Sequence, residues 1–394
     1  MSRYRLELPR GQEEILLRHC ADARYVWNLC VEQESSWRPG RGKMPGFAER
    51  CRQLTEARAG NPWLSEGSVI VQQQAVRDHA QAMVNFFAGT HRRPRWRKAG
   101  RDEGFRIVHL KQRDVRRLNR RWGAVRIPKA GWVRFRWSRA VPGNAKSFRV
   151  TRDRAGRWHI GFAAIPAPVD GPGTGEAVGI DRGIAVGAAL STGEMLRVPG
   201  LTTAETARLL RLQRILARAR RGSGRRRKVK QAVGRLKARE ADRRKDWCEK
   251  TSTDIARRFD VIRIEDLSIK SMTRSAKGTI SAPGRNVAAK AALNRGISRS
   301  GWGLLARRLQ DKAPDRVEKV NPAFTSQRCS ACGHIAPESR KSQALFRCVA
   351  CTYTENADVN AAKNIAAGHA VTARGGLGVA RPVNRELQPA PLAP

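Results

Sequence analysis

Residues 177–198 read AVGIDRGIAVGAALSTGEMLRV, and this stretch decides how the second half of the chain folds. A first apolar run, 177–180, ends in Asp181, and further runs at 185–190 and 195–198 follow after turn residues. Short apolar runs separated by turns are typical of consecutive strands. The pattern therefore predicts an antiparallel meander that opens a new domain.

Three acidic side chains stand at comparable places in this half of the chain. Asp181 closes the first strand, Glu265 closes a predicted strand at 261–264, and Asp358 begins a predicted helix. A charged residue that closes an apolar strand is costly unless it is paired or bound to metal. Taken singly, each acid is more often a cap or hairpin residue than a ligand, and Asp266 beside Glu265 shows how easily the pattern arises. Their order along the chain is nevertheless that of an RNase H-like nuclease, in which carboxylates converge on two divalent cations.

Four of the eight cysteines form two CxxC pairs whose separation is typical of a zinc ribbon. These are Cys329, Cys332, Cys348 and Cys351. The two thiolates of each CxxC pair can face one ion, and two such pairs complete a closed tetrahedral site, so we predict one structural Zn²⁺. A pair of redox dithiols is the alternative, and it lacks a thioredoxin-like context. His334 is surplus to four thiolates, and we interpret Cys20, Cys30, Cys51 and Cys248 as ordinary structural residues.

Composition limits the class of partner. The 394 residues include 78 Lys and Arg against 34 Asp and Glu, a formal net charge of +44. Such a chain repels itself strongly unless it binds a polyanion, so nucleic acid is the expected partner. A membrane surface is the alternative, but no segment reaches the roughly 18 consecutive apolar residues that a spanning helix needs. The first residues lack the features of a secretory signal, which favours a cytoplasmic protein.

The first half of the chain has a different pattern. Residues 3–8 alternate as a strand does, and 13–34 and 69–87 carry apolar residues at helical spacing. Short apolar segments between 105 and 165, separated by turn residues, predict an antiparallel barrel. Residues 203–259 are an arginine-rich helical pattern that breaks at RGSGRRR, which predicts a helical hairpin.

Basic and aromatic residues occur together in several places. The segments 209–245 and 92–97 concentrate positive charge that could neutralise phosphates. Five tryptophans alternate with arginines: Trp96, Trp122, Trp132, Trp137 and Trp158. They could stack on bases, but barrel cores also use tryptophan, and we favour core packing for them.

Several of these stretches, in the same order, resemble the TnpB family encoded by insertion sequences, which is related to the type V CRISPR effector nucleases. They are GIDRGIAVGAALSTGE, VIRIEDLSI, NPAFTSQRCSACGH and FRCVACTYTENADVNAAKNIAAG, and the N-terminal LPRGQEEILLRHCADARYVWN is also similar to the family. The resemblance covers residues 3–368. Two departures are Arg182, where many members have an apolar residue, and Phe324, where Tyr is common.

The resemblance implies a multidomain α+β chain. A wedge-type β-barrel is expected at 1–12 and 100–166, with a helical recognition domain inserted at 13–99 and a linker at 167–175. A RuvC-like α/β nuclease domain is expected at 176–322 and 354–369, with the zinc ribbon at 323–353 inserted in it and a disordered tail at 370–394. In this family Asp181, Glu265 and Asp358 would be the ligands of two Mg²⁺ ions.

The resemblance also implies an activity. A guide RNA from the transposon end would direct cleavage of double-stranded target DNA beside a short transposon-adjacent motif. We therefore expect an RNA-guided, magnesium-dependent DNA endonuclease that is cytoplasmic and associates with the nucleoid when bound to DNA. The alternatives are a guide-dependent repressor that does not cut and a DNA-binding accessory to a transposase.

Overall fold

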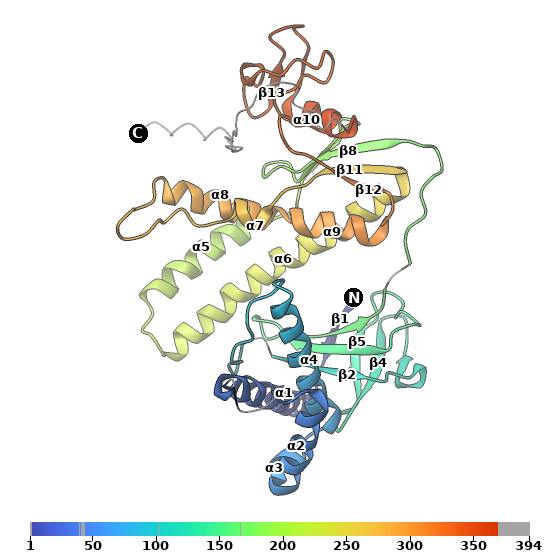
Figure 1. Cartoon of the computed structure of the whole chain (residues 1–394), viewed down its shortest axis with the longest axis vertical. Helices are drawn as coiled ribbons and strands as arrows, with labels where there is room; N and C mark the ends of the chain where they lie inside the picture. Colours follow the sequence, from blue (N-terminus) through green and yellow to red (C-terminus); the bar gives the residue numbers. More distant parts are fainter. Residues whose placement is uncertain (1, 39, 41–43, 102, 166, 369–394) are drawn as a thin grey trace. The chain divides into compact units, whose positions relative to one another are not determined.

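The computed structural model describes residues 2–38, 40, 44–101, 103–165 and 167–368 (Figure 1). The chain divides into two compact units. One is Met1–Pro166 with Arg208–Ala238, and the other is Ala167–Ala207 with Arg239–Pro394. The predicted tail at 370–394 lies outside the described residues. None of the described helices is long and apolar enough to cross a membrane.

The first unit contains a seven-stranded antiparallel sheet in the order β2-β6-β7-β1-β5-β4-β3. Its strands are β1 (Ser2–Glu7), β2 (Gly104–Val108), β3 (Val115–Arg117), β4 (Trp122–Ile127), β5 (Gly131–Arg136), β6 (Ser147–Arg152) and β7 (Trp158–Ala163). The alternation of buried and exposed residues in β5 follows from the two-residue repeat of a strand. The predicted strands are therefore present. Where a closed barrel was expected, β2 and β3 are the edges, and no ladder joins them in the described residues.

Four helices are inserted between β1 and β2: α1 (Arg10–Ser36), α2 (Phe47–Gly60), α3 (Pro62–Ser65) and α4 (Val69–Phe87). The helices predicted at 13–34 and 69–87 are confirmed, and α1 extends further at both ends. The sequence analysis did not predict α2, because this helix buries only Arg50 and Leu54 and has almost no apolar face. Arg50 donates to Glu34 on α1 and contacts His79 on α4, so a polar cluster holds α2 in place.

The tryptophans of the first unit have different environments. Trp158 is buried, which confirms core packing for this residue, and Trp137 packs against the same core. Trp122 and Trp132 are half-buried and lie under guanidinium groups, with Arg136 at 4.2 Å and Arg116 at 4.1 Å from the ring centroids. Trp96 is exposed, so core packing is wrong for this side chain.

The second unit is built on a five-stranded sheet in the order β10-β9-β8-β11-β12. The strands are β8 (Ala177–Asp181), β9 (Ala188–Leu190), β10 (Met195–Leu196), β11 (Val261–Glu265) and β12 (Val317–Val320). The first three pair antiparallel, which confirms the meander, and β11 then pairs parallel to both β8 and β12. The strand expected at 185–190 is shorter than predicted, because pairing begins at Ala188.

Helices lie on both faces of this sheet (Figure 1). In this part of the chain, α7 (Ile269–Met272), α8 (Val287–Ser300), α9 (Trp302–Lys312) and α10 (Ala357–Ala366) belong to the second unit, whereas α5 (Thr203–Arg218) and α6 (Gly224–Arg258) each have residues in both units. The end of α6 and α9 pack on one face, and α10 packs on the other. Gly179 permits the close approach of α10, since a Cβ there would lie 2.0 Å from the Ala362 carbonyl oxygen. The predicted hairpin is confirmed as α5 and α6.

Candidate active site

Side-chain alternation places two of the predicted acids on the same face of the sheet. In β8, Val178 and Ile180 face the core under α6 and α9, so Asp181 faces α10. In β11, Ile262 and Ile264 face that core, so Glu265 also faces α10. The two strands are parallel, with Ile264 paired to Ile180, and the acids are therefore neighbours at adjacent strand ends.

The third acid comes from the helix that covers this face. Asp358 is the second residue of α10, which packs against β8, β9 and β11. The helix begins there because the Asn356 side chain accepts hydrogen bonds from the amides of Asp358 and Val359, at 2.9 and 3.3 Å. Asp358 is close enough to Asp181 to act on its titration. The structure thus brings together all three predicted carboxylates.

The three carboxylates repel one another when ionised, and burial adds to the cost of their charges, so the pKa values of two of them are raised. Burial raises the pKa of Asp181 well above its usual value, and the charges of Glu265 and Asp358 add to this effect. Burial also raises the pKa of Asp358. A bound divalent cation would relieve the free-energy cost of keeping these groups ionised.

The donor set fits Mg²⁺, which prefers carboxylate oxygens. The cysteine cluster is the only group among the described residues in which three or more ligand atoms all lie within 4.8 Å of one another, so the acids are spaced more widely.

Polar neighbours hold two of the acids. The Thr325 hydroxyl donates to Glu265 Oε1 at 2.7 Å, and Arg340 lies 3.4 Å from Asp358 Oδ1. Arg182 is buried, and its guanidinium donates to the main-chain oxygen of Glu265. No local pattern pointed to Thr325 or Arg340, because each lies well away along the chain from the acid that it contacts. Arg182 was notable in the sequence only as a departure from the resemblance.

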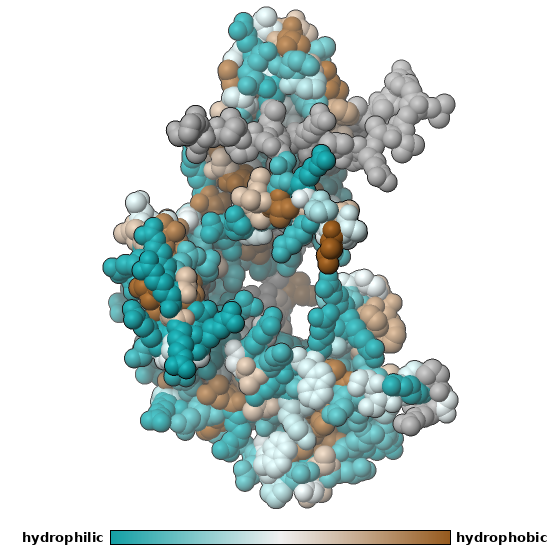
Figure 2. Space-filling view, turned by 90° about the vertical axis from the view of Figure 1, so that its left-hand side faces the viewer, coloured by the Kyte–Doolittle hydropathy of each residue, from teal (hydrophilic) through white to brown (hydrophobic). Residues whose placement is uncertain are grey.

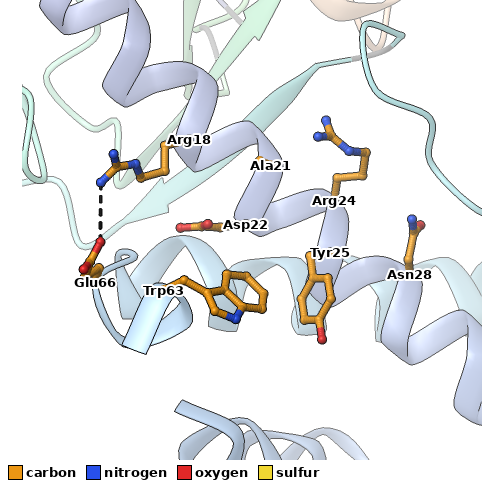
Figure 3. Close-up of a pocket in the computed structure, with 8 residues that line it drawn as sticks. All are labelled: Arg18, Ala21, Asp22, Arg24, Tyr25, Asn28, Trp63 and Glu66. Carbon is orange, nitrogen blue, oxygen red and sulfur yellow. Dashed lines mark ion pairs between the residues drawn. The ribbon is translucent and has the colours of Figure 1, made fainter. Parts of the chain in front are cut away.

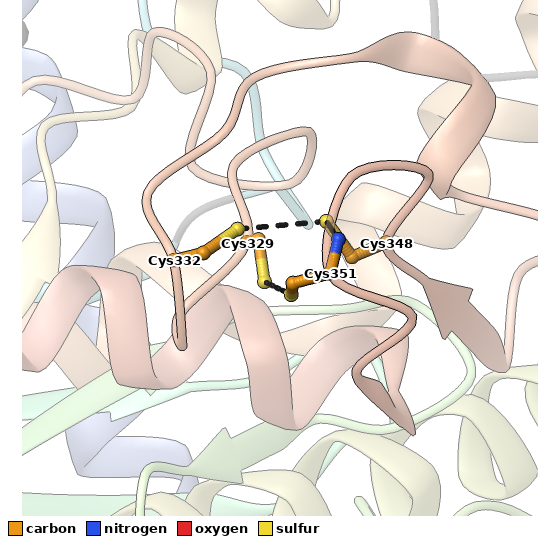
Figure 4. Close-up of side chains that lie close together, drawn as sticks. All are labelled: Cys329, Cys332, Cys348 and Cys351. Carbon is orange, nitrogen blue, oxygen red and sulfur yellow. Dashed lines mark hydrogen bonds between the residues drawn. The ribbon is translucent and has the colours of Figure 1, made fainter.

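The four predicted cysteines form a separate cluster (Figure 4). Cys329 Sγ lies 3.7 Å from Cys351 Sγ, and Cys332 Sγ lies 3.6 Å from Cys348 Sγ. A tetrahedron with Zn–S bonds of about 2.3 Å has edges of about 3.8 Å, so the sulfur positions fit one zinc ion. His334 is not part of the group. Burial raises the pKa of Cys20 to about 12 and that of Cys248 to about 11, as expected for structural thiols.

The cysteine cluster is anchored to α10. Asn360 accepts from the Ser330 amide at 2.9 Å and donates to the Arg328 carbonyl at 2.8 Å. Asn364 donates to the Thr325 and Arg328 carbonyls. The hairpin of β13 (Leu345–Arg347) and β14 (Thr354–Asn356) leads directly into the helix. The two predicted metal sites are therefore joined through the helix that carries Asp358.

Positive charge is concentrated on the helical hairpin. Exposed basic residues of α6 include Arg225, Arg227, Lys228, Lys230, Arg235 and Lys237. Acids are few here, and Glu205 already pairs with Arg239 and Arg243, each at 2.6 Å. Hydrophilic side chains cover most of the face drawn in Figure 2. Such a surface fits the phosphate backbone of a nucleic acid.

Comparison with known proteins gives matches along most of the chain. The model of the family described as "Probable transposase" matches residues 164–276, and that described as "Cas12f1-like, TNB domain" matches 302–365. "Putative RNA-guided DNA endonuclease InsQ" of Escherichia coli (strain K12) is 38% identical over 93% of this chain and 92% of its own length. "Putative RNA-guided DNA endonuclease" of Streptomyces pristinaespiralis is 31% identical over 95% and 90%. A Cas12f1 structure solved with sgRNA and target DNA has a TM-score of 0.47 at 15% identity, covering 91% of this chain and 83% of its own.

Fold and site together define a multidomain α/β protein that has a carboxylate cluster suited to hard divalent cations and a four-cysteine cluster suited to zinc. The identity to InsQ, which extends over nearly the whole of both chains, makes the family plain. The chain belongs to the TnpB family.

Proposed function

We propose that this protein is an RNA-guided DNA endonuclease of transposon origin that requires Mg²⁺ and cuts beside a short transposon-adjacent motif. The observation that carries the proposal is the convergence of Asp181, Glu265 and Asp358 at one end of the second sheet. Family membership supports the proposal that the protein uses a guide RNA and acts on DNA, since two relatives that match nearly the whole chain are named putative RNA-guided DNA endonucleases. The net charge of +44 fits two polyanionic partners.

The architecture that we propose follows the same family. The β10-β9-β8-β11-β12 sheet, with its antiparallel meander and parallel extension, supports an RNase H-like RuvC domain at 176–322 and 354–369. The four-cysteine cluster supports a zinc ribbon at 323–353. The seven-stranded sheet and its inserted helices support a wedge domain and a recognition domain in the first 166 residues.

The residues of the site have distinct roles in this proposal. Asp181, Glu265 and Asp358 would hold the two cations, and Asp181, which both other acids affect electrostatically, would be the central ligand. Bound there, the ions would activate a water molecule and stabilise the leaving oxygen of the phosphodiester. Thr325 orients Glu265 through its hydrogen bond. Arg340 keeps a positive charge beside Asp358, where the scissile phosphate would develop negative charge.

The experiment begins with purification of the full chain from cells that carry its transposon end, followed by sequencing of the RNA that copurifies. The ribonucleoprotein is then incubated with a plasmid that matches the guide, in Mg²⁺ or in a chelator. We expect double-strand cleavage only in Mg²⁺. Nucleic-acid affinity should also fall steeply with salt, because many phosphates are contacted. A preparation that carries no RNA and binds nucleic acid without salt dependence would refute the proposal.

A guide-dependent binding protein that does not cut is the second candidate, and an accessory to a transposase is a variant of it. Loss of one acid would favour these functions, but Asp181, Glu265 and Asp358 are all present. Guide-dependent binding without nicking in Mg²⁺ would support them.

A further inference from the structure

A cavity of about 520 Å³ lies between α1 and α3 in the first unit, and neither the carboxylate site nor the cysteine cluster uses it (Figure 3). Two aromatic rings form part of its wall, Tyr25 from α1 and Trp63 from α3. Their centroids are 4.8 Å apart and the ring planes meet at 85°, an edge-to-face pair. The flat ring of a ligand could therefore stack on one of them while its edge faces the other.

Both rings are open to solvent. Trp63 is 49% exposed and Tyr25 is 41% exposed. Single exposed aromatic residues are common, but here two adjacent rings line one cavity of a strongly basic protein. In nucleic-acid-binding proteins such rings commonly serve as platforms for bases.

A buried acceptor lies beside the rings. Asp22 is only 3% exposed, it lines the cavity, and its Oδ2 has no hydrogen-bond partner among the described residues. The Gln72 amide donates to the Leu64 carbonyl at 2.9 Å and lies close enough to the Asp22 carboxylate to lower its pKa, against the larger and opposite effect of burial. Gly67 leaves room for the carboxylate, since a Cβ there would lie 2.3 Å from Asp22 Oδ2. A buried carboxylate oxygen without a partner is costly unless a ligand donates to it.

Cationic side chains stand at the edge of the cavity. Arg18 pairs with Glu66 at 3.7 Å, and both side chains are about two-thirds exposed. Exposed ion pairs of this kind contribute little free energy, so Arg18 can turn to a phosphate at small cost. Arg24, by contrast, is fixed by two hydrogen bonds to Glu103, at 2.7 and 2.8 Å.

From these features we propose that the cavity binds one unpaired nucleobase, which stacks on Trp63 or Tyr25. The exocyclic amine of the base would donate a hydrogen bond to the Asp22 carboxylate, and Arg18 would contact the neighbouring phosphate. Carboxylates pair well with such amines, so adenine, cytosine and guanine fit better than uracil or thymine. The inference rests on the proposed function only in taking nucleic acid as the partner. The base can come from the RNA or from the target DNA.

Ultraviolet crosslinking of the purified ribonucleoprotein, followed by peptide mapping, tests the site directly. An adduct on Tyr25 or Trp63 before DNA is added identifies an RNA base, and one that forms only with matched target DNA identifies a DNA base. Either result supports the proposal. Adducts on other peptides with none on these two residues would overturn it.

Binding of short single-stranded oligonucleotides, measured in salt high enough to weaken phosphate contacts, is the second test. We expect Trp63→Leu to reduce affinity by about 5-fold to 150-fold, the range for loss of one stacked base. The control Phe87→Leu removes an exposed ring outside the cavity and should bind as the parent does. Equal affinity for parent and Trp63→Leu would overturn the proposal.

The near-isosteric variant Asp22→Asn tests selectivity without removing a side chain. The parent should bind oligo(A) and oligo(C) more tightly than oligo(U), and this preference should fall in Asp22→Asn. An unchanged preference would rule out the role of Asp22. Since these measurements need no cleavage and no guide, their failure can be distinguished from failure of the proposed endonuclease.

Discussion

Replacing Cys348 by Ser should remove the zinc ion and, with it, most of the DNA cleavage. Cys348 is one of four thiols whose sulfur atoms lie within 4.8 Å of one another. Three thiolates and a hydroxyl are a much poorer set of zinc ligands. Because zinc binding and local folding are coupled, residues 323–353 should lose their fixed structure in this variant.

The structure gives the size of the effect on the acid site. Six hydrogen bonds and one ion pair join this segment to α10: Ser330 to Asn360, Asn360 to Arg328, Asn364 to Thr325 and to Arg328, Ala357 to Ala344, Lys363 to Tyr353, and Arg340 with Asp358. At about 1 kcal/mol for each hydrogen bond, α10 would lose about 6 kcal/mol of anchoring. Asp358 would then be poorly fixed, and a displacement of about 1 Å can reduce a rate about 100-fold.

The assay combines elemental analysis with cleavage of a matched target. We expect about one zinc per parent chain, none in Cys348→Ser, and cleavage reduced about 100-fold or more. Cys51→Ser is the matched control, since Cys51 lies outside the cluster and should leave both measurements unchanged. A Cys348→Ser protein that keeps its zinc refutes the assignment of the ligands. One that loses zinc but cuts at the parent rate refutes the coupling to Asp358.

Three further predictions concern other side chains. Asp181→Asn or Glu265→Gln should abolish cleavage yet leave guide-dependent binding, and the double variant should cut little worse than either single one. The control Asp266→Asn, beside the site, should retain activity in the same assay. Arg182→Met should reduce the cleavage rate about tenfold, because the Glu265 carbonyl loses a charge-assisted hydrogen bond. A variant that cuts at the parent rate across a Mg²⁺ titration would contradict this. Burial lowers the pKa of His79 from 6.5 to about 4, so the unfolded chain takes up the proton first as pH falls through this window. Urea unfolding followed by fluorescence should therefore show up to about 3 kcal/mol of stability lost between these pH values, and a smaller loss in His79→Gln.

Local patterns were sufficient for much of the fold. Alternation and turn residues predicted the meander at 177–198, and helical spacing predicted α4 at its observed bounds. They were not sufficient for α2, which buries an arginine and one leucine instead of an apolar stripe. Whether the first sheet closes could not be predicted either, because closure depends on whether its edge strands β2 and β3 pair, and local patterns do not specify this even though only six residues separate the two strands along the chain.

The sequence by itself determined the types of residue available at the two sites: three acids at strand and helix ends, and four cysteines in two CxxC pairs. It could do so because strand alternation, helix starts and CxxC spacing act over a few residues. Only the tertiary structure decided that Thr325, Arg340 and Arg182 surround the acids, and that Asp22 lies beside two exposed rings. Those contacts join residues on different elements, and their positions follow from the packing of helices on sheets, which no short stretch of sequence specifies.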